Sequence, residues 1–133
     1  MVAAVADTHA ALWLLFGDLR LSTTAKKFFD TAAEQGRKVA LSPISLVEIV
    51  YLVEKKRLPA GSFENLTEAL KDPGHILEEG PFTSGVAAAM RQISREAVPD
   101  MPDRIVAATA IFLGVPIISR DGKIRASNVR TIW

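Results

Sequence analysis

The first apolar run of the chain, Val2–Ala6, constrains the fold more than any other stretch. It is short, it ends at Asp7, and it leads directly into Ala11, Leu12 and Leu15 at helical spacing. This pattern predicts a buried strand that delivers the Asp7 carboxylate to a corner between a strand and a helix.

Short apolar segments alternate with helical patterns along the rest of the chain. Strands are expected at 2–6, 38–41, 75–77, 115–119 and 129–133, and helices at 8–16, 23–35, 44–53, 63–70, 84–95 and 102–113, with a last short helix from 121. Such alternation is typical of right-handed crossovers and a mostly parallel sheet covered on both faces. We therefore expect an α/β fold, a three-layer α/β/α sandwich.

Several helix ends carry local signals. Ser22 and Ser62 are expected to be N-caps, and Ser42 is expected to cap a helix that has Pro43 in its first turn. Gly36 follows a helical pattern and predicts a stop. These signals predict where the helices begin and end.

Composition limits the classes of function. A chain of 133 residues with 49% apolar and 23% charged residues predicts one globular domain spanning 1–133. The absence of cysteine excludes a disulfide framework, a thiolate zinc site and a cysteine nucleophile. No signal peptide and no membrane-spanning run is recognisable, so we expect a cytoplasmic protein without a membrane partner.

Acidic residues stand at the expected corners, and each of three has a purely structural interpretation. Asp7 and Asp121 suit a helix N-cap and a tight turn, and Asp103 suits a capping arrangement with Asp100. Glu48 is different, because it interrupts a helical segment that is apolar on nearly every side and is expected to be buried. A buried carboxylate needs a compensating cation, and no base lies at a helical spacing that would pair with it.

Taken together, the acids predict a metal site. Asp7 and Asp121 follow strands, and Glu48 and Asp103 lie in early helical turns, so all can face the carboxyl edge of the sheet. Two carboxylates about 5 Å apart repel by roughly 3 kcal/mol at an effective dielectric of about 20. A hard divalent cation, Mg²⁺ or Mn²⁺, would relieve this repulsion, and such a site supports attack of water on a phosphodiester.

Basic residues near these acids are candidates for holding a nucleic-acid backbone. Arg104 adjoins Asp103, while Arg120 and Lys123 flank Asp121. The alternative is a solvated basic face, which the sequence leaves open.

Four segments in order resemble the PIN-domain ribonucleases, and among them the VapC-type toxins of toxin–antitoxin pairs. The segments are Val5–Ala10, Leu41–Ile49, Asp100–Ala110 and Ile118–Asp121. The resemblance implies a Mg²⁺- or Mn²⁺-dependent endoribonuclease that cuts RNA, forms homodimers and is inhibited by a cognate antitoxin protein.

The same resemblance assigns roles to individual residues. The catalytic and metal-binding set of the family falls on Asp7, Glu48, Asp103 and Asp121. Asp100 resembles a further acid of the subgroup and is assigned an outer or capping role, and Thr8 and Ser119 are expected to hydrogen-bond to the carboxylates or to bound water.

A non-catalytic PIN-like module that binds RNA or protein is the alternative function. The complete set of acids argues against it, because a degenerate member is expected to lose at least one ligand. His9 and Trp13 are assigned to packing or surface roles before any role in the cleft.

Overall fold

The computed structural model describes residues 1–133 and contains one parallel sheet with helices on both sides. The strands are β1 (Val2–Ala6), β2 (Lys38–Leu41), β3 (Leu77–Glu79), β4 (Ile117–Ile118) and β5 (Thr131–Ile132), in the order β3-β2-β1-β4-β5. All four strand pairs are parallel. The predicted α/β/α sandwich is confirmed.

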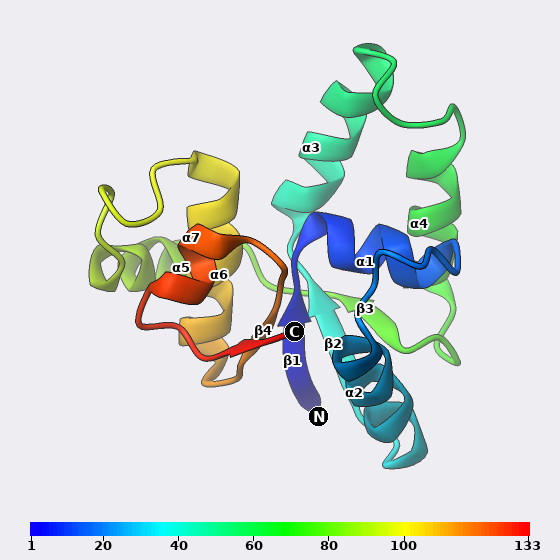
Figure 1. Cartoon of the computed structure of the whole chain (residues 1–133), viewed down its shortest axis with the longest axis horizontal. Coiled ribbons are helices and arrows are strands. Elements are labelled where there is room, and N and C mark those ends of the chain that lie inside the picture. The colour runs from blue at the N-terminus through cyan, green and yellow to red at the C-terminus, as the bar shows by residue number, and fades with distance from the viewer.

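Seven α-helices and one 3₁₀ turn connect the strands. They are α1 (Thr8–Leu15), α2 (Thr23–Glu34), α3 (Pro43–Glu54), α4 (Ser62–Lys71), α5 (Ser84–Ala89), η1 (Met90–Gln92), α6 (Met101–Leu113) and α7 (Gly122–Ala126). In Figure 1, α5, α6 and α7 lie on one side of the sheet and α1, α2 and α4 on the other, while α3 rises beyond the strand ends.

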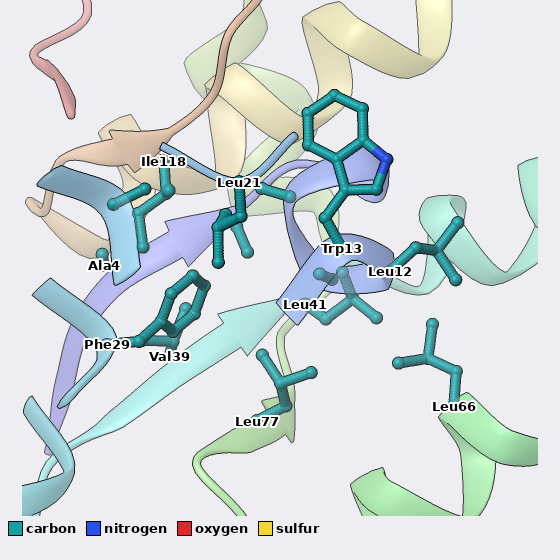
Figure 2. Close-up of a cluster of buried hydrophobic side chains, with 14 of the residues drawn as sticks. Ala4, Leu12, Trp13, Leu21, Phe29, Val39, Leu41, Leu66, Leu77 and Ile118 are labelled. Carbon is teal, nitrogen blue, oxygen red and sulfur yellow. The ribbon is translucent and has the colours of Figure 1, made fainter. Parts of the chain in front are cut away.

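Each face of the sheet has its own core, because neighbouring strand residues point to opposite faces. Val39 and Leu41 of β2 belong to one cluster, with Phe29, Leu12 and Leu66 from the helices. Figure 2 shows this cluster between the sheet and its covering helices. Strand residues that point to the opposite face, such as Val5, Ala40 and Ile117, belong to the second cluster, which α5, α6 and α7 cover.

The register brings three chain corners to one edge of the sheet. Ala6 pairs with Leu41 of β2 and with Ile118 of β4. The next residues, Asp7, Ser42 and Ser119, therefore leave the carboxyl ends of adjacent strands at the same level. The central position of β1 makes Asp7 the middle of this edge.

Three of the four predicted helix-end signals are confirmed. Ser22 and Ser42 cap α2 and α3 through their hydroxyls, which accept from Ala25 N at 3.0 Å and Ile44 N at 3.2 Å. Gly36 follows α2 with a φ of +68°, the left-handed conformation that ends a helix. The prediction for Ser62 is wrong: Gly61 is the N-cap of α4, and Ser62 lies in its first turn.

Two predicted elements are wrong because tertiary contacts override local pattern. The strand expected at 75–77 is instead β3, Leu77–Glu79. Lys38 Nζ donates to the carbonyls of Pro73, at 2.6 Å, and His75, and this holds the preceding segment as a turn. The helix expected at 84–95 ends at Ala89, before the η1 turn.

The chain has no helix with the length and apolar character that crossing a membrane requires.

Candidate active site

A cleft of about 360 Å³ opens at the carboxyl edge of the sheet. Every residue that lines it except Trp13 is polar or charged. The lining consists of Asp7, Thr8, His9, Trp13, Arg20, Glu48, Asp100, Asp103, Arg120 and Asp121. The structure thus brings together all four of the acids predicted as a metal site, and adds Asp100 to them.

Asp7 is placed by its position between β1 and α1. It is the N-cap of α1, where its Oδ1 accepts a hydrogen bond from Ala10 N at 2.8 Å. Burial raises the pKa of Asp7, and hydrogen bonds from Ser119 and Ala10 oppose that rise by stabilising the carboxylate. Asp7 therefore caps α1 and lines the cleft at the same time.

Ser119 links Asp7 to Asp121. Its Oγ accepts from Asp121 N at 3.0 Å, and its hydroxyl lowers the pKa of Asp7. Asp121 in turn caps α7 by accepting from Lys123 N at 2.8 Å and Ile124 N at 3.2 Å. One buried serine thus contacts the turn that carries Asp121 and contributes to the electrostatic environment of Asp7.

Asp103 has the most perturbed carboxyl group of the cleft. Burial, followed by the negative charges of Asp100, Asp121, Glu48 and Asp7, raises the pKa of Asp103 to about 7. Each of these charges disfavours ionisation of Asp103, so the acids share one electrostatic environment. A cation in the cleft would reverse this effect.

Glu48 lies in the second turn of α3 and is only half-buried. The prediction that its helix is buried on all sides is wrong, because α3 contacts the rest of the chain along one side. Val47, Val50 and Tyr51 are exposed, at 51%, 39% and 60%. Glu48 makes no ion pair with any base, since the two ion pairs in the structure join other residues.

The donor set fits a hard divalent cation. All candidate ligands are carboxylates, and Mg²⁺ and Mn²⁺ prefer oxygen. As the side chains stand, no group of three or more His, Asp or Glu residues is gathered closely enough to hold a metal ion.

Two predicted site residues have other partners. The Thr8 hydroxyl donates to Ser45 Oγ at 2.8 Å, so it does not donate to a carboxylate, which corrects that part of the expectation; its alternative, a contact with bound water, stays a prediction. Arg104 donates from Nε to Ile93 O and from Nη2 to Met90 O, both at 3.0 Å. Its guanidinium holds the η1 turn and is not directed to a substrate, which corrects the expectation for Arg104.

The other two predicted bases lie beside the acids. Arg120 lines the main cleft. Lys123 lines an adjoining cavity of about 390 Å³ together with Asp100, Asp103 and Asp121.

Sequence reasoning missed three residues of the cleft. Arg20 belongs to the connection between α1 and α2, and no periodic or motif signal marked it. His9 and Trp13 lie one turn apart on α1, with ring centroids 5.7 Å apart. Trp13 is a core residue, as predicted, and also lines the cleft.

A parallel sheet with helices on both faces and an acidic, oxygen-donor cleft across the ends of its central strands defines an α/β protein with a candidate site at the carboxyl ends of its strands. The chain belongs to the PIN domain family, whose model matches residues 4–128. The resemblance drawn from the four sequence segments is thereby confirmed.

Individual relatives agree with this assignment. Ribonuclease VapC22 of Mycobacterium tuberculosis is 28% identical over 141 aligned positions that cover all of both chains. Among solved structures, VapBC2 from Rickettsia felis bound to a promoter DNA fragment superposes with a TM-score of 0.70 at 16% identity, covering 98% of this chain and 97% of that one. FitAcB from Neisseria gonorrhoeae gives 0.59 at 22% identity, covering 96% and 95%. These structures share the fold.

Proposed function

We propose that residues 1–133 form a single nuclease domain that hydrolyses RNA phosphodiester bonds internally with the help of Mg²⁺ or Mn²⁺. The observation that carries the proposal is the convergence of five acids in one cleft, where their mutual repulsion and burial raise the pKa of Asp103 to about 7. The name of the M. tuberculosis relative, a ribonuclease, supports RNA as the substrate.

Asp7, Glu48, Asp103 and Asp121 would hold the metal and form the catalytic set. One or two direct carboxylate ligands suffice for Mg²⁺, because this ion retains several waters. When bound, the cation supplies charge neutralisation at the phosphoryl oxygens and an acidified water.

The remaining side chains of the cleft position these acids and the substrate. Ser119 contacts the turn that carries Asp121 and lowers the pKa of Asp7, while Asp100 fixes the first turn of the helix that carries Asp103. Arg120 and Lys123 stand beside the acids, where they would hold RNA phosphates.

We further propose that the chain is the toxin of a toxin–antitoxin pair, acts in the cytoplasm, forms a homodimer and is inhibited by a cognate antitoxin. The solved neighbour from R. felis is a VapBC2 complex. The exposed apolar residues Val47, Val50 and Tyr51 on α3 offer a surface for contact with another protein chain. Light scattering of the purified chain, alone and with the product of an adjacent reading frame, tests both assemblies.

The test of the nuclease is cleavage of a panel of structured and single-stranded RNAs with Mg²⁺, Mn²⁺ or a chelator. We expect metal-dependent internal cuts by the wild type and a loss of at least about a hundredfold in Asp7→Asn and Asp103→Asn. Asp30→Asn removes an exposed acid of α2 outside the cleft and serves as the matched control. Circular dichroism verifies that each variant is folded.

Manganese calorimetry separates metal binding from substrate choice. Binding that is lost in the cleft variants and kept in Asp30→Asn supports the metal site. A wild type that neither cuts RNA nor binds Mn²⁺ would overturn the nuclease and leave the non-catalytic binding module.

A further inference from the structure

The indole ring of Trp13 lies next to two guanidinium groups at the rim of the acidic cleft. The Arg120 guanidinium carbon is 4.6 Å from the ring centroid, and that of Arg20 is 5.2 Å away. Arg120 follows β4 and Arg20 follows α1, so the fold brings them together from distant parts of the chain. All three residues line the same cleft as the acids.

Trp13 is a fixed platform. It is 6% exposed and belongs to the core cluster beneath α1. In Figure 2 its ring extends from α1 at the edge of that cluster. Trp133 packs against it with ring centroids 5.8 Å apart, which further restricts the ring. A guanidinium that stacks on such a ring keeps its N–H groups free at its edge.

The two arginines differ in what holds them. Arg20 donates from Nε and Nη2 to the carboxylate of Asp18, at 3.1 and 2.7 Å. Arg120 forms no ion pair within 4.0 Å, although five acids line the cleft with it. Its charge is therefore available for a ligand, while Arg20 is already oriented by its partner.

The charge distribution indicates what that ligand is. A cleft lined by five carboxylates repels a polyanion, so a nucleic acid needs cationic contacts at the rim to approach them. The unpaired guanidinium of Arg120 matches the oxygens of a phosphodiester, and Arg20, whose Nε and Nη2 bond to Asp18, has its Nη1 left for the same purpose.

We propose that Arg120 and Arg20, held on Trp13, form a phosphate clamp that binds the backbone of single-stranded RNA next to the acidic centre. This proposal rests on the proposed nuclease function and extends it to a defined substrate contact. Arg120 makes the principal phosphate contact, and Asp18 positions Arg20.

The test is equilibrium binding of the full chain to a fluorescein-labelled single-stranded RNA of about 12 nucleotides in chelator, where cleavage does not interfere. We expect Arg120→Ala to weaken binding about tenfold, as for loss of a charged hydrogen bond. The plot of log K against log salt has a negative slope, and its magnitude should decrease by about 0.7, the value for one phosphate contact on a single strand. Arg20→Ala and Asp18→Ala should weaken binding less.

Arg130→Ala is the matched control. It removes the same charge at an exposed position, beside a cavity lined by residues that precede β4, at the opposite edge of the sheet. We expect its affinity and salt slope to equal those of the wild type.

Tryptophan fluorescence gives a second readout. The chain contains two tryptophans, so Trp133→Phe leaves Trp13 as the sole emitter. RNA should change the emission of this variant, and the change should disappear when Arg120→Ala is added.

The outcomes separate the clamp from the nuclease. If Arg120→Ala still cuts RNA in a metal-dependent way and binds RNA as tightly as the wild type, the clamp is overturned and the nuclease is not. If the wild type neither cuts RNA nor binds Mn²⁺, but binds RNA in a way that depends on Arg120, the nuclease is overturned and the clamp is supported. If a polyglutamate peptide binds as tightly as RNA and with the same dependence on Arg120, the ligand is an acidic peptide and the phosphate assignment is overturned.

Discussion

Asp100 Oδ2 accepts a hydrogen bond from the backbone N of Asp103 at 3.0 Å, so one acid of the cleft caps the helix that carries another. The contact stabilises the first turn of α6. It also places two negative charges close together, and the charge of Asp100 is the largest contribution after burial to the raised pKa of Asp103. Helix capping and site electrostatics are therefore coupled at this corner.

Substitutions at Asp100 should separate the two effects. Asp100→Asn keeps an oxygen acceptor and removes the charge, so the helix stays capped and the pKa of Asp103 falls. Asp100→Ala removes both, and loss of the cap should cost about 1 kcal/mol of unfolding free energy. Carboxyl NMR titration and chemical unfolding of the metal-free protein measure the two quantities. An unchanged pKa of Asp103 in Asp100→Asn would contradict the coupling.

Asp103 should make the metal-free protein less stable as pH rises. Its pKa is about 7 when folded and 3.8 as the reference value, so the folded state binds the extra proton between these values. Stability therefore declines from about pH 4 to about pH 7. Asp103→Asn removes this decline, and should be more stable than the wild type above pH 7 by about 1–2 kcal/mol after allowance for solvent screening.

Urea unfolding in chelator across pH 4 to 8 measures this difference. Asp30→Asn, an exposed acid outside the cleft, should follow the wild-type pH dependence. Parallel curves for Asp103→Asn and the wild type would show that Asp103 ionises without penalty. Added Mn²⁺ should reduce the difference in unfolding free energy between Asp103→Asn and the wild type, because a cation stabilises the ionised form of Asp103.

Strands and helix ends were predictable where the determining contacts are local. Val2–Ala6 and Lys38–Leu41 are strands with the predicted bounds, and Ser22 and Ser42 cap their helices through their own hydroxyls. Prediction failed where a distant side chain intervenes. Arg104 takes the carbonyls of Met90 and Ile93, which a continuing α5 would have used for its own hydrogen bonds.

The acids of the cleft were predictable for a similar reason. Asp7 and Asp121 follow strands, Asp103 lies in the first turn of α6 and Glu48 in the second turn of α3, and parallel strands bring such positions to one edge. The grouping of Trp13 with its two arginines was not predictable. Arg20 and Arg120 come from connections far apart in the sequence, and only the tertiary fold brings them to the same ring. The exposure of Val47 and Tyr51 could not be predicted either, because hydrophobic periodicity does not show whether other elements cover a helix on every side.

Replacing Lys56 with glycine should stabilise the folded protein. It is the only non-glycine residue with a positive φ, 59°, and it follows α3 in a C-terminal motif where Lys56 N and Arg57 N bond to Val53 O and Leu52 O. Lys56→Gly removes the strain of a side chain in this conformation and should raise the unfolding free energy by about 0.5–1 kcal/mol.

Lys55→Gly is the matched control for this change. Lys55 has a φ of −82°, which any residue adopts, so glycine there should lower stability by about 0.5–1 kcal/mol through backbone entropy. Thermal and urea unfolding measure both variants. Equal destabilisation by the two glycines would contradict the assigned strain.

The buried hydroxyl pair of Thr8 and Ser45 should show strong energetic coupling. Thr8 Oγ1 donates to Ser45 Oγ at 2.8 Å, and both residues are buried, at 4% and 0% exposure. Ser45→Ala leaves the Thr8 hydroxyl without this acceptor and should cost about 1–3 kcal/mol. Adding Thr8→Val removes the hydroxyl that has lost its partner. The double variant should therefore recover most of the unfolding free energy that Ser45→Ala loses. A double-mutant cycle by urea unfolding measures the coupling, and strictly additive losses would show that water satisfies Thr8 instead.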